Sequence, residues 1–269
     1  MDKKVVLITG GSSGLGKAIG TYLASKGFKV YGTARNPKNY PDFDAFELIP
    51  LDVKQPDSVR NAVSSVISKE DRLDILINNA GVGITGPIEE TPHEEILNVF
   101  DINFNGPVHM MKAVLPQMRK QGGGLIINVT SIAGFMGLPF RGYYSASKGA
   151  LGIVTEALRM ETKSFGISIT NLAPGDFATN IAAGRYHAPV VKGSAYEKVY
   201  QKSLDLMNEH VDAGGDPADV AKKVHEIIQS KNPKIHQPVG EFMQRLSLLL
   251  KRILPGKVYE KLLLNHYKL

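Results

Sequence analysis

A short apolar run leads directly into a glycine-rich turn near the N-terminus, in the stretch Val5-Val6-Leu7-Ile8-Thr9-Gly10-Gly11-Ser12-Ser13-Gly14-Leu15-Gly16. The apolar run predicts a buried strand, and residues 18–26 have the periodicity of a helix. Glycines permit a tight turn between the two, and the first N–H groups of a helix can hold a pyrophosphate. The stretch therefore predicts a dinucleotide site that is formed by Thr9, Gly10, Ser12, Ser13, Gly14, Leu15 and Gly16. The spacing Gly10-x-x-x-Gly14-x-Gly16 differs from the form G-x-G-x-x-G, so a glycine turn without a ligand is the alternative.

Four further apolar runs follow the first, at residues 29–33, 73–77, 125–129 and 168–173, and they are separated by stretches with helical periodicity, such as residues 151–163. Strands that are apolar throughout are buried on both faces, which is typical of a parallel sheet covered by helices. We therefore predict an α/β fold, a doubly wound parallel sheet of the Rossmann type, in a single domain over residues 1–269. Ligands bind to such a sheet at the carboxyl ends of its strands.

The positive charge of the chain is concentrated near its C-terminus. The 269 residues carry a formal net charge of +6, from 32 Lys and Arg against 26 Asp and Glu. In residues 241–269 the only acids, Glu241 and Glu260, face six cations, which are Arg245, Lys251, Arg252, Lys257, Lys261 and Lys268. Because the excess is local, it indicates no extended basic surface, and we predict no nucleic-acid partner.

The residue types also exclude several kinds of site. The chain has no cysteine, which excludes a disulfide framework, a thiol nucleophile and a cysteine-ligated metal. Its seven histidines form no pair at helical metal-ligand spacing, so we predict no metal site. The first strand is too short for a signal-peptide core, and no apolar run approaches the roughly 18 residues that span a bilayer. We expect a cytoplasmic protein without a transmembrane anchor.

Tyr144 and Lys148 stand four residues apart in Tyr144-Ser145-Ala146-Ser147-Lys148. This spacing places a phenol and an ammonium group on one face of a helix, where the cation favours the phenolate. A phenol in that position can give and take a proton near neutral pH. Tyr143 cannot replace Tyr144, because the residue four positions after it is Ser147. The pair therefore predicts proton-transfer chemistry.

The end of the second strand indicates which dinucleotide is bound. NAD-binding folds of this type have a carboxylate about 20 residues after the glycine turn, where it binds the ribose hydroxyls. Here the chain reads Gly32-Thr33-Ala34-Arg35, without an acid. Arg35 would attract a 2′-phosphate, so the sequence favours NADP over NAD. The alternative is an ordinary solvated arginine on the surface.

Several separated motifs agree with one family. From Lys4 to about Gly240 the chain resembles the short-chain dehydrogenase/reductase family, because its motifs follow in that family's order: the turn at residues 9–16, Asp52-Val53, Asn78-Asn79-Ala80-Gly81, Asn103, Ser131, Tyr144-x-x-x-Lys148, and Pro174-Gly175 with Thr179. Phe177 stands where the family often has a small β-branched residue. The resemblance implies an NADP(H)-dependent oxidoreductase that transfers a hydride between the nicotinamide and a carbonyl or alcohol of a small-molecule substrate. It also implies a homo-oligomer.

The same resemblance implies four catalytic residues. Tyr144 exchanges the proton with the substrate oxygen, while Lys148 supports the phenolate and holds the nicotinamide ribose. Ser131 hydrogen-bonds the substrate oxygen, and Asn103 supports a proton relay through water. Each also has a structural alternative, such as a loop cap for Ser131 or a core position for Tyr144. A protein that binds NADP(H) as a regulator or scaffold, without turnover, is the alternative function.

The remaining cofactor contacts are implied in the same way. Asp52 and Val53 would lie beside the adenine, with the carboxylate accepting from the amino group. The residues that shape the crevice near the adenosine would be Asn79, Ala80 and Gly81, and those at the nicotinamide edge would be Pro174, Gly175 and Thr179.

Two segments lie outside these motifs. Residues 180–215 have few strand signals, and we interpret them as a segment that covers an apolar substrate. A helix is predicted to follow from Pro217, capped by Asp216. Within residues 241–269, the run from Phe242 to Leu254 mixes apolar and basic residues at helical spacing. Such a helix packs on the domain or at a subunit interface; contact with a membrane or a lipid-like substrate is the alternative.

Overall fold

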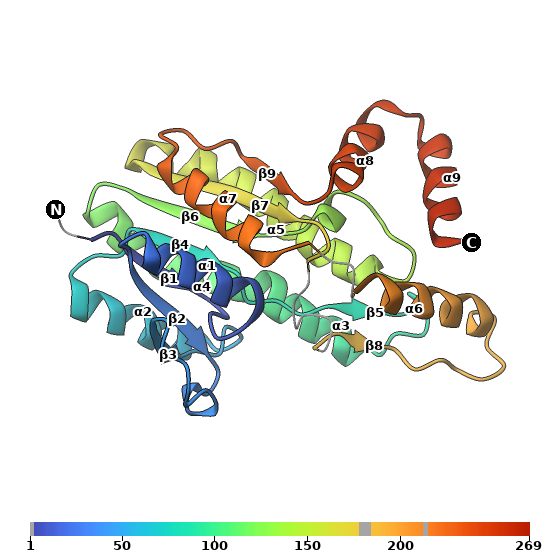
Figure 1. Ribbon diagram of the computed structural model, residues 1–269, viewed down its shortest axis with the longest axis horizontal. Helices are drawn as coiled ribbons and strands as arrows, with labels where there is room; N and C mark the ends of the chain where they lie inside the picture. The colour runs from blue at the N-terminus through green and yellow to red at the C-terminus, as the bar shows by residue number, and fades with distance from the viewer. Residues whose placement is uncertain (1–2, 178–183, 212–214) are drawn as a thin grey trace.

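The computed structural model describes residues 3–177, 184–211 and 215–269, and seven parallel strands form its main sheet (Figure 1). In spatial order these are β3 (Glu47–Pro50), β2 (Lys29–Ala34), β1 (Val5–Ile8), β4 (Ile75–Asn78), β6 (Gly124–Val129), β7 (Ile167–Pro174) and β9 (His236–Val239). The strand order reverses between β1 and β4, so a ligand crevice is expected at the carboxyl ends of these two strands. The predicted α/β fold of the Rossmann type is confirmed.

Both faces of the sheet are covered by helices, as the continuously apolar strands require. In β1, Val5 and Leu7 pack in the hydrophobic core beneath α2 (Pro56–Glu70), α4 (Gly106–Lys120) and α5 (Gly142–Glu161). Val6 and Ile8 face the opposite core, beneath α1 (Gly14–Ser25) and α7 (Pro217–Gln229). All four side chains are buried, because successive side chains of the strand point into the two cores on opposite faces of the sheet.

The five strands predicted from apolar runs are present, with bounds that differ by a few residues. The two edge strands, β3 and β9, were not predicted. Only Ile49 of β3 is fully buried, and all four residues of β9 are half-buried. An edge strand faces the core with part of its surface, so the apolar pattern that marks the central strands is absent. Pro238 is tolerated in β9 because that strand lies at the edge.

The remaining elements are a second small sheet, further helices and short turns. A small parallel pair joins β5 (Ile84–Thr85) to β8 (Tyr186–His187), and four more helices are α3 (His93–Phe100), α6 (Glu197–Val211), α8 (Phe242–Ile253) and α9 (Gly256–Tyr267). A π-helical turn at Asp101–Asn105 links α3 to α4, and short 3-10 turns occur at Pro37–Asn39, Ile132–Phe135 and Lys163–Phe165.

The predicted helix start at Pro217 is confirmed, because Asp216 Oδ1 accepts a hydrogen bond of 2.8 Å from the backbone N–H of Ala218. The amphipathic run from Phe242 forms α8, also as predicted. Of the segment interpreted as a substrate cover, residues 180–183 and 212–214 lie outside the described residues. The rest contains β8 and α6, a helix that the sequence analysis did not predict.

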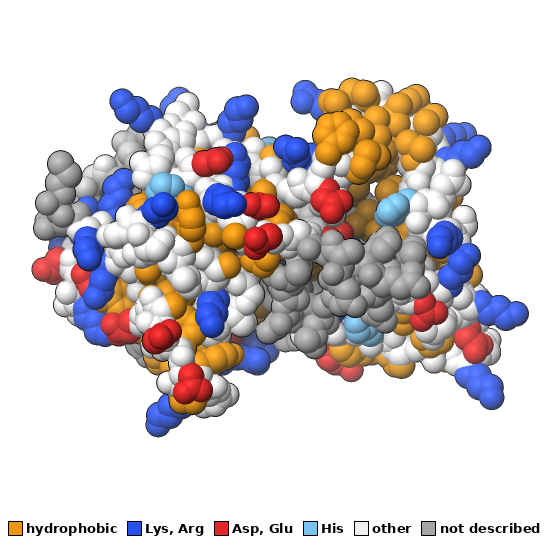
Figure 2. Space-filling view, viewed as in Figure 1, with side chains coloured by type: hydrophobic (Ala, Val, Ile, Leu, Met, Phe, Trp, Pro, Cys, Tyr) orange, Lys and Arg blue, Asp and Glu red, His pale blue; other side chains and the backbone are white. Residues whose placement is uncertain are grey.

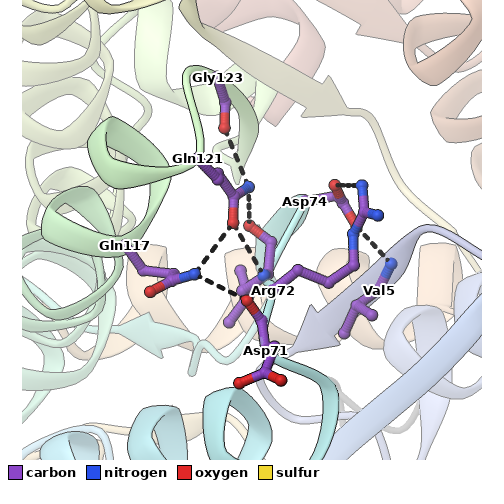
Figure 3. Close-up of polar contacts among 8 residues, drawn as sticks. Val5, Asp71, Arg72, Asp74, Gln117, Gln121 and Gly123 are labelled. Carbon is purple, nitrogen blue, oxygen red and sulfur yellow. Dashed lines mark hydrogen bonds and ion pairs between the residues drawn. The ribbon is translucent and has the colours of Figure 1, made fainter.

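A polar cluster fixes the amino ends of β1 and β4, opposite the expected crevice (Figure 3). Asp74 accepts hydrogen bonds from the backbone N–H of Val5 at 2.7 Å and from the Arg72 guanidinium at 2.7 and 2.9 Å. Gln121, just after α4, donates from its amide to the carbonyls of Leu73 and Gly123 at 2.9 and 3.0 Å. These contacts hold the amino ends of β1 and β4 together and connect β4 to the end of α4.

Within the described residues, no helix combines the length and the apolar character that crossing a bilayer requires.

Candidate active site

The glycine turn at residues 9–16 has a backbone conformation that glycine adopts most readily. Gly10 and Gly14 have φ of 66° and 52°, the left-handed region that favours glycine. A Cβ on Gly11 would lie 2.7 Å from Gly32 Cα, so the turn packs directly against β2. Ser13, the N-cap residue of α1, makes no side-chain hydrogen bond to the helix, which leaves the first N–H groups of α1 without that partner. These residues fit a pyrophosphate at the helix N-terminus.

Thr9 and Asn79 hold the turn against β4. The Thr9 hydroxyl oxygen accepts hydrogen bonds of 3.0 Å from the backbone N–H groups of Asn79 and Ala80. In return, the Asn79 side chain donates to the carbonyls of Thr9 and Gly10 at 3.0 and 3.1 Å. The side chains of Thr9 and Asn79 therefore position the turn from both sides.

The predicted residues of the adenosine end follow β2 and β3. Thr33 accepts hydrogen bonds from the N–H groups of Gly10 and Gly11, and Arg35 follows it on the surface, exposed. Asp52 accepts from the N–H of Lys54 at 3.0 Å, and Val53 is buried. Arg35 thus lies two residues beyond the contact of β2 with the turn, just after the carboxyl end of β2.

One cleft at the carboxyl ends of the strands is lined both by residues predicted to be catalytic and by residues predicted to bind the cofactor. Those that line it are Leu15, Asn79, Gly81, Ser131, Tyr144, Lys148, Pro174 and Gly175. Tyr144 and Lys148 come from the first turns of α5, and Ser131 follows β6. The Tyr143 hydroxyl instead donates to the Ile88 carbonyl at 3.0 Å, and Tyr143 does not line the cleft. Thr179 lies outside the described residues.

Lys148 is buried, and its ammonium group donates a hydrogen bond of 2.9 Å to the Val129 carbonyl at the end of β6. Burial lowers the pKa of Lys148 from 10.5 to about 8, because the charged form loses its hydration. Ser131 is also buried; its hydroxyl accepts from the Ala133 N–H at 3.1 Å and donates to the Pro174 carbonyl at 3.4 Å. Both side chains are therefore held by backbone groups at the ends of strands.

Asn103 lies behind the cleft, in the π-helical turn, and is fully buried. Its side-chain oxygen accepts from the Val82 N–H at 2.9 Å, and its amide donates to the Val82 carbonyl at 2.9 Å and to Ser147 at 3.1 Å. A Cβ on Gly81 would lie 3.2 Å from both Asn103 Oδ1 and Lys148 Nζ. Gly81 therefore permits these two polar groups to approach each other.

The cleft also contains residues that the sequence analysis did not select, namely Val82, Val129, Thr130, Arg141, Asp176, Arg185 and Met207. The Arg141 guanidinium carbon lies 5.3 Å from the centre of the Tyr144 ring. Burial lowers the pKa of Arg185, and the neighbouring Arg141 lowers it further. The spacing of three between Arg141 and Tyr144 was visible in the sequence. No local signal marked Arg185, which the pairing of β8 with β5 brings to the cleft.

The C-terminal helices border the same cleft. Gln244, in the first turn of α8, donates to Asp176 Oδ2 at 3.2 Å, and its side chain occupies the space that a Cβ on Gly175 would need. Tyr267, at the end of α9, is buried; burial raises the pKa of its phenol, while the nearby charge of Arg141 lowers it. Phe177 packs against Gly215 ahead of α7. Within the described residues, no three His, Cys, Asp or Glu side chains form a group that could hold a metal ion.

A family model described as short chain dehydrogenase matches residues 4–189, which is most of the chain and includes the glycine turn, Ser131, Tyr144 and Lys148. The chain belongs to the short-chain dehydrogenase family. The family predicted from the sequence motifs is therefore confirmed. This short-chain dehydrogenase is 38% identical to a 3-ketodihydrosphingosine reductase of Bacteroides thetaiotaomicron, over 97% of this chain and 96% of that protein.

Solved structures agree with the fold. A short-chain dehydrogenase from Streptomyces avermitilis, 29% identical, superposes with a TM-score of 0.83 over 100% of this chain and 97% of that one. ElxO with NADP bound is 26% identical, with a TM-score of 0.71 over 88% and 97% of the two chains. A 3-ketoacyl-(acyl-carrier-protein) reductase from Brucella melitensis, complexed with NADH, is 24% identical and shares the fold, with a TM-score of 0.73 over 88% and 96%.

Proposed function

We propose that this short-chain dehydrogenase is an NADPH-dependent carbonyl reductase that acts on a ketone carried by an apolar, lipid-like molecule. The observation that carries the proposal is the single cleft lined by Ser131, Tyr144 and Lys148 together with Leu15 and Gly175. Acid–base groups and dinucleotide-binding residues are there within reach of one ligand.

The chemistry follows from what each side chain offers. A bound nicotinamide supplies the hydride. The Tyr144 hydroxyl gives its proton to the carbonyl oxygen, and the Ser131 hydroxyl donates a hydrogen bond that orients this oxygen. Lys148, with its lowered pKa, lies one helical turn from Tyr144 and stabilises the phenolate that remains when Tyr144 gives up its proton. Asn103 positions the Val82 backbone through two hydrogen bonds, and its proposed part in a proton relay rests on the family resemblance.

The choice of NADPH rests on Arg35. It is exposed, follows the strand that contacts the glycine turn, and has no carboxylate beside it in the sequence where an NAD-binding fold has one. A guanidinium group there favours the 2′-phosphate by a charge-assisted hydrogen bond.

The substrate class rests on the lining of the cleft and on the relative. The lining includes the apolar residues Val82, Phe177 and Met207, beside the charged Arg141, Asp176 and Arg185. The Bacteroides thetaiotaomicron protein is named a 3-ketodihydrosphingosine reductase, and we extend its class of substrate, a ketone on a long apolar chain, to this protein. We further propose that β8 and α6 cover the apolar chain of the substrate. We also propose that the enzyme is a homo-oligomer located in the cytoplasm. Light scattering of the purified protein tests the oligomeric state.

The test is the loss of NADPH absorbance with a panel of ketones that includes 3-ketodihydrosphingosine and short water-soluble ketones. The wild type is compared with Tyr144→Phe and with the control Tyr143→Phe, whose hydroxyl binds the Ile88 carbonyl outside the cleft. We expect turnover that falls about 10²–10⁴-fold in Tyr144→Phe and is unchanged in Tyr143→Phe. NADPH binding without turnover of any ketone would favour the regulatory alternative, and equal turnover in the two variants would refute the assignment of Tyr144.

A further inference from the structure

The exposed surface of α8 and α9 is unusually apolar. Figure 2 shows hydrophobic side chains gathered where Figure 1 places α8 and the start of α9, with Lys and Arg side chains at the margins. The exposed apolar residues of this surface, which we call the α8–α9 face, are Phe242, Met243, Leu249, Ile253, Val258 and Leu262. Phe242 and Ile253 expose 67% and 62% of their surface, far more than an apolar side chain in the core of a domain.

The helices do not need this face for packing on the domain. Leu248, Leu250 and Leu254 turn to the other side, where they pack against Ile132 and Tyr259. Phe242, Leu249 and Ile253 repeat at intervals of seven and four, which places them on one stripe of α8 away from that core. Val258 and Leu262, four residues apart on one side of α9, are exposed as well. The helices α8 and α9 thus have some apolar residues buried in the protein and others exposed on the surface.

Cations flank the exposed stripe along one side. Arg245 and Arg252 are three residues after Phe242 and Leu249, and Lys261 is three residues after Val258, so each lies beside the stripe. All three are exposed, and none of them forms an ion pair within the described residues. Long cationic side chains can extend from an apolar surface toward phosphate groups while their alkyl parts stay in contact with it.

We propose that the α8–α9 face docks on the surface of a bilayer that contains anionic phospholipids. An apolar stripe flanked by cations is the pattern of helices that lie in a membrane interface, with the apolar side at the acyl chains and the cations at the headgroups. A second copy of the chain fits this face less well. Residues 241–269 carry six cations and two acids, so two such faces in contact would bring like charges together.

One of the two helices also borders the cleft. Gln244 of α8 contacts Gly175 and Asp176 there, on the opposite side of the helix from Phe242. A docked α8 would therefore lie between the bilayer and this edge of the cleft.

Vesicle flotation of the full-length protein tests the proposal without turnover, so its outcome is independent of the proposed reaction. Vesicles of phosphatidylcholine alone are compared with vesicles of phosphatidylcholine and phosphatidylglycerol in equal parts. We expect the wild type to float with the anionic vesicles and to lose binding as salt is raised. Both Leu249→Glu/Ile253→Glu and Arg245→Glu/Arg252→Glu should weaken this binding by about tenfold or more.

Two controls separate this surface from general effects. Ile153→Glu/Met160→Glu changes two apolar residues on α5 that are more exposed than Leu249 and Ile253, and Lys3→Glu/Lys4→Glu makes the same change of charge as the double arginine variant, at the N-terminus. Both should float like the wild type. The proposal is wrong if the wild type stays unbound with anionic vesicles, or if the α8–α9 variants float as well as the controls. A wild-type dimer that Leu249→Glu/Ile253→Glu converts to a monomer, without vesicle binding by either, would assign the face to self-association instead.

Discussion

The guanidinium group of Arg141 lies over the ring of Tyr144, 5.3 Å from its centre. Arg141 is the N-cap residue of α5, and Tyr144 follows three positions later, so the geometry of one helix start holds the pair together. Tyr144 is thus flanked by two cations, Arg141 over its ring and Lys148 one turn along α5. A guanidinium group over the face of an aromatic ring is attracted by the ring, so Arg141 holds the Tyr144 ring in place at the cleft.

We therefore predict that Arg141→Met lowers kcat/KM by about tenfold, the scale of a desolvated cation–π contact, because the Tyr144 ring loses the group that holds it. Arg119→Met is the matched control, because its guanidinium lies 5.7 Å from the Phe165 ring, away from the cleft. Steady-state kinetics of the two variants and the wild type measure the effect. Equal kcat/KM for Arg141→Met and the wild type would contradict a role for this cation.

A second prediction concerns the cost of burying Lys148. Its pKa is about 8 in the folded protein against 10.5 for an ordinary lysine, so between these values the unfolded chain binds more protons than the folded one. The free energy of unfolding contributed by this group therefore rises as pH increases from about 8 to about 10.5. Below pH 8 both states are protonated, and the full penalty, on the order of 3 kcal/mol, remains.

Lys148→Met should remove this penalty together with catalysis. The variant also loses the hydrogen bond to the Val129 carbonyl, which costs about 1–2 kcal/mol, so a net gain of roughly 1–2 kcal/mol at pH 7 is expected. Urea unfolding at pH 7 and at pH 10 gives the difference between variant and wild type, which should shrink at the higher pH. Lys112→Met, at an exposed position on α4, should show neither effect. A variant less stable than the wild type at pH 7 would show that the Val129 contact outweighs the burial.

The structural features predicted correctly from the sequence are those encoded by near neighbours. The glycine turn follows an apolar strand directly, and the placement of Tyr144 and Lys148 on one helix needs only the period of a helix. Asn103 shows the limit of such reasoning. The sequence placed it in the candidate site through the family resemblance, but no spacing indicates that its amide pairs with both backbone groups of Val82, because that contact depends on how the π-helical turn packs.

The remaining parts of the site come from distant segments. Arg185 reaches the cleft through the pairing of β8 with β5, and Gln244 and Tyr267 reach it through α8 and α9. Contacts between residues so far apart in the chain depend on tertiary packing, which periodicity alone does not encode. Of the cations that line the cleft with Tyr144, the sequence analysis therefore predicted Lys148 but not Arg141 or Arg185.

A third prediction tests the choice of cofactor at Arg35. Arg35→Asp should raise KM for NADPH by about 10–100-fold, because a charge-assisted hydrogen bond to the 2′-phosphate is replaced by repulsion. KM for NADH should change little or fall. Lys29→Ala, at the opposite end of the same strand β2, removes a cation far from the turn and serves as the control. Equal changes in KM for the two cofactors in Arg35→Asp would show that Arg35 is an ordinary surface residue.

The fourth prediction follows from Gly16, where helix α1 passes closest to the glycine turn. A Cβ at this position would overlap the Gly10 carbonyl oxygen and lie 2.6 Å from the Asn79 amide nitrogen. An alanine within a helix is ordinarily more stable than a glycine by about 0.5–1 kcal/mol. Here the overlap with backbone atoms should outweigh that gain, since relief requires α1 to move away from the turn at a cost of about 1–3 kcal/mol.

Gly16→Ala should therefore lower the urea midpoint of unfolding and weaken NADPH binding by about tenfold or more, because the shift of α1 separates its N-terminus from the turn that Asn79 holds. Gly137→Ala is the matched control, since a Cβ there meets no atom within 4 Å and its φ lies outside the left-handed region. Urea unfolding and fluorescence titration with NADPH measure both effects. If Gly16→Ala were as stable as Gly137→Ala, the gain from helix propensity would equal or exceed the cost of the steric overlap. The close approach of Gly16 to Gly10 and Asn79 would then not be needed for the stability of the turn.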